Sequence, residues 1–233
     1  MTTDRKSSGT SSIANDMSTG WIDLYRSGTA GISTWSDAAP PFVEELRRFL
    51  PPGAEILETC AGDGRISQVL AEWGAGLTAL DLSSAALKQL SAKFTRRGRR
   101  PPRTVIGSAT DIPLGDDQFD IVVCVDGICQ LDRPRLAMEE AARVLRPGGL
   151  FMFDVFTPKD DTFGQGEQIG AQDFLYKGCL FRFFEAAQFE GLFAGLFRVI
   201  ERFETVWSDP PHGDFRPQTH SHHANVFVLE KLK

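Results

Sequence analysis

Apolar and polar positions alternate between two spacings over most of the chain. Short apolar runs at 54–58, 77–82, 104–106, 121–125 and 150–155 predict five strands. Between them, apolar residues recur every three or four positions over 40–50, 66–73, 83–94 and 136–145, which predicts helices. Because strands and helices take turns, we expect a doubly wound, Rossmann-like parallel sheet with right-handed crossovers and helices on both faces.

The two ends of the chain lack the regular strand–helix alternation of its middle. Residues 1–20 hold too few large apolar side chains to offset the entropy of ordering them, so we predict a disordered tail. Residues 21–233 form one predicted domain. Within it, 156–193 is polar and glycine-rich at first and then aromatic, which indicates an insertion or lid over the acceptor. A helix near 184–193 and strands at 196–207 and 225–232 complete a seven-stranded, mostly parallel sheet.

Composition and charge narrow the class of protein. The 233 residues are 42% hydrophobic and carry a formal net charge of −6, as expected for a globular domain that repels polyanions. Four cysteines form no CxxC pair, and no apolar stretch follows Arg5 and Lys6. We therefore expect a reducing, cytoplasmic setting, no membrane partner, and no nucleic-acid partner unless a local basic patch such as 96–103 binds one.

A glycine loop follows the first predicted strand. Gly62 and Gly64 allow a tight turn that brings backbone amides against a ligand, although two glycines also make an ordinary turn. Asp81 stands at the end of the second strand, where a carboxylate can accept both hydroxyls of a ribose. Ser67 occupies the position of the third glycine of a dinucleotide loop, and Asp63 opposes phosphate charge. A cofactor with a ribose and no phosphate, such as S-adenosylmethionine, fits better.

Five segments in order resemble the class I S-adenosylmethionine-dependent methyltransferases, in the small-molecule, UbiE-like group. They are 58–64 (ETCAGDG), 80–83 (LDLS), 107–114 (GSATDIPL), 119–124 (FDIVVC) and 145–149 (LRPGG). The resemblance covers 58 to about 157. The sequence departs from the family pattern at Cys60, which replaces the first glycine, and at Ser108, which replaces an acidic residue beside the adenine.

The resemblance implies a cofactor site, residue by residue. Glu58, Cys60 and Gly62 would line the amino-acid end, and Gly64 belongs to the same loop. The remaining positions would hold the ribose, the adenine and the floor of the site: Asp81, Leu82, Ser108, Ala109 and Val125. Trp21, Tyr25 and Trp35 resemble the aromatic N-terminal segment that covers the cofactor in several such enzymes, but core aromatics of a lid helix would look the same.

Asp126 and Gln130 are the candidate catalytic residues. Asp126 follows the fourth strand and can position or deprotonate an acceptor, and Gln130 can orient the acceptor. Asp126 beside Gly127 is also a common turn pair. We expect a small-molecule acceptor, apolar or aromatic, of the kind found in secondary metabolism. A protein that binds the cofactor without transferring methyl, as a cyclase, isomerase or regulatory binder, and an RNA methyltransferase are the alternatives.

The histidines raise the question of a metal. His220 and His222 would point the same way along a strand, and imidazole is a common ligand. No carboxylate or thiol accompanies them at ligand spacing in the sequence, so a solvated loop that enters a strand is the preferred interpretation. Asp126 and Asp154 could suggest a magnesium site, but Val155 stands where an oxygen ligand would be expected. We predict no metal.

Overall fold

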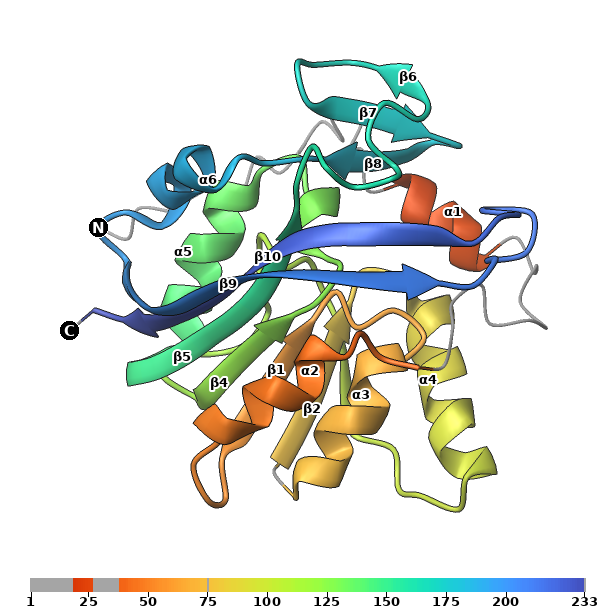
Figure 1. The fold of residues 1–233 in the computed structure, drawn as a ribbon. Coiled ribbons are helices and arrows are strands. Elements are labelled where there is room, and N and C mark those ends of the chain that lie inside the picture. The colour runs from red at the N-terminus through yellow and green to blue at the C-terminus, as the bar shows by residue number, and fades with distance from the viewer. Residues whose placement is uncertain (1–18, 27–37, 75, 233) are drawn as a thin grey trace, which may run out of the picture.

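The computed structural model describes residues 19–26, 38–74 and 76–232. The main sheet has the order β3-β2-β1-β4-β5-β10-β9 (Figure 1). Its strands are β1 (Glu55–Thr59), β2 (Gly76–Asp81), β3 (Arg103–Ile106), β4 (Phe119–Cys124), β5 (Leu145–Phe156), β9 (Phe197–Asp209) and β10 (His220–Lys231). The first five are parallel, and β10 runs antiparallel to both of its neighbours. The predicted fold class, a seven-stranded, mostly parallel Rossmann-like sheet, is confirmed.

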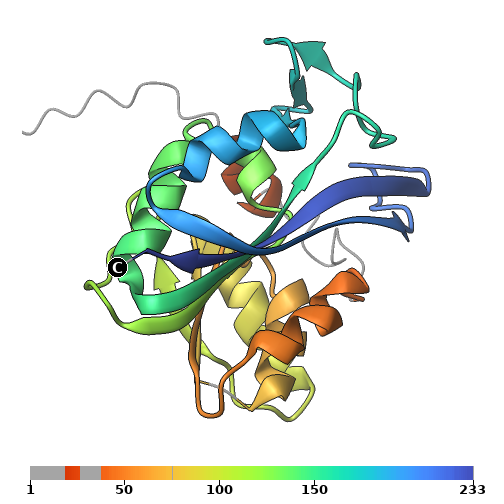
Figure 2. The ribbon, with the colours of Figure 1, turned by 60° about the vertical axis from the view of Figure 1, so that its left-hand side comes forward.

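Helices cover both faces of the sheet. Figures 1 and 2 show α2 (Phe42–Leu46), α3 (Arg65–Leu70) and α4 (Ser84–Arg96) on one side, and α5 (Pro134–Val144) and α6 (Ala186–Phe193) on the other. The side chain of Ser83 caps α4 by accepting from the amide of Ala86 at 3.3 Å. Short 3-10 turns follow at Arg47–Phe49, Ala71–Trp73 and Ile128–Gln130. The sheet is buried between these layers, as the unbroken apolar run of β4 requires.

The segment after β5 forms a second, smaller sheet. Its strands are β6 (Glu167–Gln168), β7 (Asp173–Tyr176) and β8 (Cys179–Arg182), in an antiparallel meander. Together with α1 (Thr19–Arg26) it stands beyond one edge of the main sheet (Figure 1). Most of the predicted tail, residues 1–18, lies outside the described residues, and α1 begins at Thr19.

The C-terminal hairpin departs from the sequence-based prediction. We expected the last strand to begin at Asn225, but β10 begins at His220 and the whole 220–231 segment pairs with β9. His220, His222 and His223 are therefore in a strand, whereas His212 stays in the loop that joins the two strands. Because β9 runs parallel to β5, the end of β9 and the start of β10 return to the edge where β1, β2 and β4 end.

Candidate active site

A cavity opens at the carboxyl edge of the sheet, where the strand order reverses between β1 and β4. In open α/β sheets this is the usual place for a ligand. The cavity encloses about 1080 Å³, part of which is open solvent. Its wall combines α1 and the glycine loop with the ends of β2, β4 and β5, the small sheet and the C-terminal hairpin.

The glycine loop adopts the left-handed backbone that its sequence predicts. Cys60, Gly62 and Gly64 have φ values of 56°, 54° and 87°. A Cβ on residue 62 would come within 2.6 Å of the Tyr25 hydroxyl, and one on residue 64 within 2.6 Å of Leu90. Glycine is therefore required at both positions, at 62 to leave room in the cavity and at 64 to let α3 pack against α4. Cys60 adopts a left-handed backbone conformation that is usually found at glycine.

Asp81 links the second strand to this loop. Its carboxylate accepts hydrogen bonds from the amides of Gly62 and Ser83, both at 2.8 Å. Burial raises the pKa of Asp81 and these two bonds oppose the rise. A carboxylate has about four lone-pair sites, so two remain for a ligand. Asp81 can thus fix the loop and receive a diol at the same time.

The described cofactor-site predictions fall into two groups. Seven line the cavity: Tyr25, Cys60, Gly62, Asp81, Leu82, Ala109 and Val125. Three are not among its lining residues: Glu58, Gly64 and Ser108. The Ser108 hydroxyl is bonded to the hydroxyl and amide of Thr110. Trp35 lies outside the described residues, whereas Trp21 lines the cavity and packs on Phe181 with ring centroids 5.6 Å apart.

Glu58 is buried under the loop. Its side chain is 2% exposed and accepts a short hydrogen bond from the Ser67 hydroxyl. Burial raises the pKa of Glu58 to about 8, against the lowering effect of Ser67. The carboxyl is therefore mainly protonated at neutral pH.

Asp63 differs from its expected role. The sequence suggested that its charge would oppose a phosphate, but the carboxylate is buried and lies 2.8 Å from Lys93 Nζ on α4. This ion pair compensates the charge of Asp63 and ties the loop to α4. The argument against phosphate from Asp63 alone is therefore weak.

Asp126 follows β4 with a φ of 55°, a strained conformation for a residue with a Cβ. Its amide donates to Asp154 at 2.8 Å, and its carboxylate lies 3.4 Å from Arg65. Burial raises the pKa of Asp126, and Arg65 and His222 oppose the rise. Burial and the neighbouring Asp126 charge raise the pKa of Asp154 well above its ordinary value. Asp126 and Gln130 both line the cavity.

Arg65 is a site residue that sequence reasoning missed. Its guanidinium binds both carboxylate oxygens of Asp209, at 2.9 and 2.7 Å, and also donates to the carbonyl of Ala38. Arg65 and Asp209 line the cavity and are 144 residues apart in the chain. The only local signal was the place of Arg65 directly after the loop glycine.

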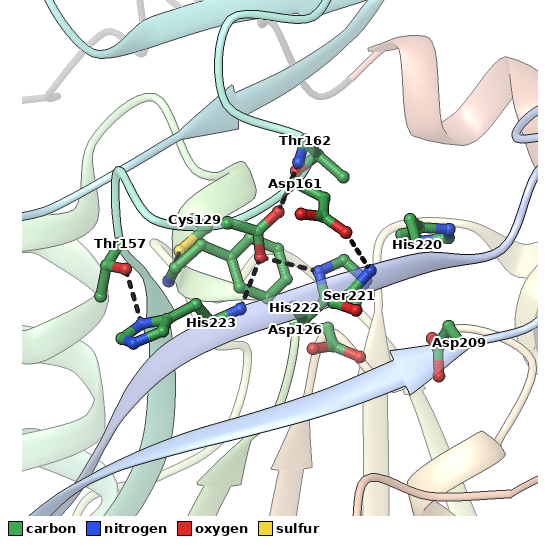
Figure 3. A network of polar contacts seen from close by, with 12 residues as sticks. Asp126, Cys129, Thr157, Asp161, Thr162, Asp209, His220, Ser221, His222 and His223 are labelled. Carbon is green, nitrogen blue, oxygen red and sulfur yellow. Dashed lines mark hydrogen bonds and ion pairs between the residues drawn. The ribbon is translucent and has the colours of Figure 1, made fainter.

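The His-rich segment is not the solvated loop that we expected. His212, His220 and His222 are between 1% and 8% exposed, and His222 lines the cavity beside Asp126 (Figure 3). A carboxylate does accompany them, since ligand atoms of Asp209, His212 and His220 lie within 4.8 Å of one another. The sequence argument that no carboxylate is near is therefore wrong.

The residue types of this cluster are those of a metal site, but the Asp209 carboxylate is already paired with Arg65. Both oxygens of Asp209 accept from the guanidinium, and His212 Nε2 lies 3.5 Å from one of them. Burial opposes the charge of Asp209, but the bonds from His212 and Arg65 hold its pKa below the ordinary range. A divalent ion at Asp209 would sit beside a fixed positive charge. The absence of a metal stays our prediction.

Comparisons with known proteins agree with this geometry. Residues 57–153 match a family model described as a methyltransferase domain. Demethylmenaquinone methyltransferase of Renibacterium salmoninarum is 35% identical over 114 residues, which is 48% of this chain and 45% of that protein. The chain thus spans about half the length of this curated relative.

Two solved structures share the fold over nearly the whole chain. One is titled for the conversion of a disulfide bond into a thioacetal group during echinomycin biosynthesis; it has a TM-score of 0.72, 18% identity, and coverage of 93% of each chain. The other, Burkholderia thailandensis 1,6-didemethyltoxoflavin-N1-methyltransferase, has a TM-score of 0.65 and 21% identity over 93% of this chain and 89% of that one. The chain contains a class I S-adenosylmethionine-dependent methyltransferase domain.

The cofactor of this methyltransferase domain is S-adenosylmethionine, and the cavity fits it. Glycine at 62 leaves space against Tyr25, and the Asp81 carboxylate has lone pairs left for a ligand at the end of β2. No helix in the described part of the chain is long and apolar enough to span a membrane.

Proposed function

We propose that this chain transfers the methyl group of S-adenosylmethionine to a small-molecule acceptor with an aromatic or apolar body. One observation carries the proposal. The cavity that holds the cofactor residues of the methyltransferase domain continues, without a separating wall, to aromatic side chains of the C-terminal half. Trp21, Phe156 and Phe181 line it together with Gly62 and Asp81. The acceptor class is consistent with small-molecule methyltransferases such as the toxoflavin enzyme.

The residues divide the work along this cavity. Gly62 and Asp81 would bind the amino-acid and ribose parts of the cofactor, while the aromatic wall excludes water around the sulfonium. Sulfonium is an activated leaving group, so alignment of nucleophile and methyl supplies much of the rate. Asp126 and Gln130 also line the cavity and are our candidates to contact the acceptor.

The RNA alternative finds no support at this cavity. None of the residues of the basic stretch 96–103 lines it. Arg97 donates to the Gln68 side chain on α3, and Arg99 pairs with Glu72 in the 3-10 turn that follows α3. These two arginines bind neighbouring elements and not the site.

Two measurements test the proposal. Calorimetry with S-adenosylmethionine should give saturable heat, and no heat at millimolar cofactor would contradict the cofactor site. Incubation with a panel of phenols, amines and thiols should then release S-adenosylhomocysteine. Binding without release from any acceptor would favour the alternative of a cyclase, isomerase or regulatory binder.

A further inference from the structure

A histidine and an aspartate from distant parts of the chain form a dyad at the acceptor side of the cavity. His222 lies on β10, and Asp160 lies in the loop that follows β5. His222 Nδ1 is 2.9 Å from Asp160 Oδ2, and both side chains are buried (Figure 3 shows His222 in this network). We propose that His222, held by Asp160, is the general base of the proposed reaction. It takes the proton from the small molecule that is methylated.

Asp160 is fixed on both of its oxygens. Oδ1 accepts from the amide and the hydroxyl of Thr162, and Oδ2 accepts from the amide of His223 at 3.0 Å as well as from His222. Burial opposes the charge of Asp160, but the bonds from His222 and Thr162 keep its pKa below the ordinary value. The carboxylate is therefore ionised and can only accept.

An ionised partner determines the tautomer of His222. Because Asp160 accepts, Nδ1 carries a proton, so in the neutral ring it is Nε2 that keeps its lone pair. Nε2 has no hydrogen-bond partner among the described residues, and the His222 side chain lines the cavity. A carboxylate that orients an imidazole with its second nitrogen toward substrate is the arrangement of a general base.

Packing holds the ring in this orientation. The imidazole stacks on Phe156 with centroids 4.8 Å apart and planes 12° apart, and Trp207 lies 5.0 Å away on β9. The loop itself is fixed to β10, since the amide of Asp161 donates to the carbonyl of Ser221 and the amide of Ser221 donates back to the Asp161 carboxylate. The dyad is thus preorganised before any ligand binds.

Other titratable groups face His222 from the surrounding elements. They are Asp126 after β4, Asp209 at the end of β9 and His220 on β10. Arg65 and Arg216 also line the cavity. Asp126 and Asp209 are both paired with Arg65, and burial lowers the pKa of His220 to about 4. Since the two carboxylates are paired and His220 does not line the cavity, His222 is the group best placed to receive a proton from the acceptor.

The proposed step balances. The acceptor's O–H, N–H or S–H loses its proton to His222 Nε2, and the lone pair of the nucleophile forms the bond to the methyl carbon. The carbon–sulfur bond breaks with its electrons on sulfur, which leaves neutral S-adenosylhomocysteine. The imidazolium, stabilised by Asp160, then releases the proton to water. Asp126 would align the acceptor in this scheme rather than deprotonate it.

The inference rests on the proposed function, and its test uses the wild-type activity as reference. We would compare His222→Asn with His223→Asn, a matched control on the neighbouring residue whose ring faces Thr157 and not the cavity. With two para-substituted phenols, a weakly acidic one and 4-nitrophenol, His222→Asn should slow release of S-adenosylhomocysteine by about 10²–10³-fold for the weak acid. For the nitrophenol, whose hydroxyl is far more acidic and needs less help to ionise, the loss should be less than about tenfold.

Several results would overturn the inference. An equal loss with both phenols, or a loss as large in His223→Asn, would indicate a structural role only. Nitrogen NMR of the imidazole should show the Nδ1-protonated tautomer of His222 in wild type and a mixture in Asp160→Asn; an Nε2-protonated ring in wild type would contradict the dyad. If wild type binds S-adenosylmethionine but methylates nothing, the proposed function fails. If wild type methylates phenols and His222→Asn does so equally well, only the present inference fails.

Discussion

The two sides of the cavity are built over different distances along the chain. On the cofactor side, Gly62 meets Asp81 19 residues away and Asp63 meets Lys93 30 residues away. On the acceptor side, Asp160 meets His222 62 residues away and Arg65 meets Asp209 144 residues away. The cofactor side is the product of consecutive strand–helix units, whereas the acceptor side exists only when the C-terminal hairpin returns to the sheet.

The chemistry of the two sides differs as well. The cofactor side presents glycines, backbone amides and the carboxylates of Asp63 and Asp81, and this loop and strand end fall inside the 57–153 match to the methyltransferase domain. The acceptor side gathers Arg65, Asp126, Asp209 and His222, with Phe156 and Phe181. Except for Arg65 and Asp126, these residues lie beyond the matched segment. Substitutions on the two sides should therefore have separable effects on cofactor affinity and on turnover.

Replacement of Asp81 by alanine should have the largest effect on the cofactor side. Two ribose hydroxyls lose a charged acceptor, each bond being worth roughly 1.5–3 kcal/mol, so the dissociation constant for S-adenosylmethionine should rise by about 10²–10⁴-fold. The loop would also lose the bond from the Gly62 amide. Calorimetry on a variant shown to be folded by circular dichroism measures it, and an unchanged constant would contradict the ribose assignment.

Asp126→Asn should separate the two sides. Asparagine keeps the shape but removes the charge that faces Arg65, so alignment of the acceptor should suffer and turnover should fall by about 10²-fold. Affinity for S-adenosylmethionine should stay within about threefold. Parallel calorimetry and product assays decide the matter. A joint loss of affinity and turnover would place Asp126 on the cofactor side instead.

The cofactor side could be predicted from the sequence because its signals are local. Strand–helix alternation, the glycine loop and Asp81 at a strand end all lie within one segment of the chain. The acceptor side could not, because a run such as 212–223, rich in His, Pro and Ser, resembles a solvated loop until its partners are known. Asp160 and Phe156 bury His222, and no local pattern relates these residues. The burial of Asp63 against Lys93 was hidden for the same reason.

Glu58→Gln should test whether the buried carboxyl under the loop serves stability. Burial raises its folded pKa to about 8, so the neutral form is favoured in the folded state. The stability that the neutral Glu58 carboxyl contributes to the folded state is therefore fully present below its unfolded-state pKa near 4.5. It is lost as pH rises through the folded-state pKa of about 8. Relative to wild type, Glu58→Gln should gain on the order of 4 kcal/mol in unfolding free energy between pH 5 and pH 9.

Urea unfolding across that pH range measures the gain, with Glu44→Gln on the exposed face of α2 as control. A pH-independent difference between wild type and Glu58→Gln would mean that Glu58 remains ionised in the folded protein.

The smallest expected effect concerns Cys60, the residue that replaces the first glycine of the loop. Its φ of 56° costs a residue with a Cβ about 1 kcal/mol, whereas glycine pays about 0.5–1 kcal/mol of extra unfolded-state entropy. Cys60→Gly should therefore leave the unfolding free energy within about 1 kcal/mol of wild type.

Cys60→Ala keeps the strain and loses the contact of the thiol with Cys124, so it should be less stable than Cys60→Gly. At an ordinary position alanine is the more stable of the two. Urea unfolding of both variants measures which has the larger unfolding free energy. If the alanine variant is the more stable, the loop relaxes at residue 60. Calorimetry should find cofactor affinity nearly unchanged in both, because the loop amide that Asp81 holds belongs to Gly62.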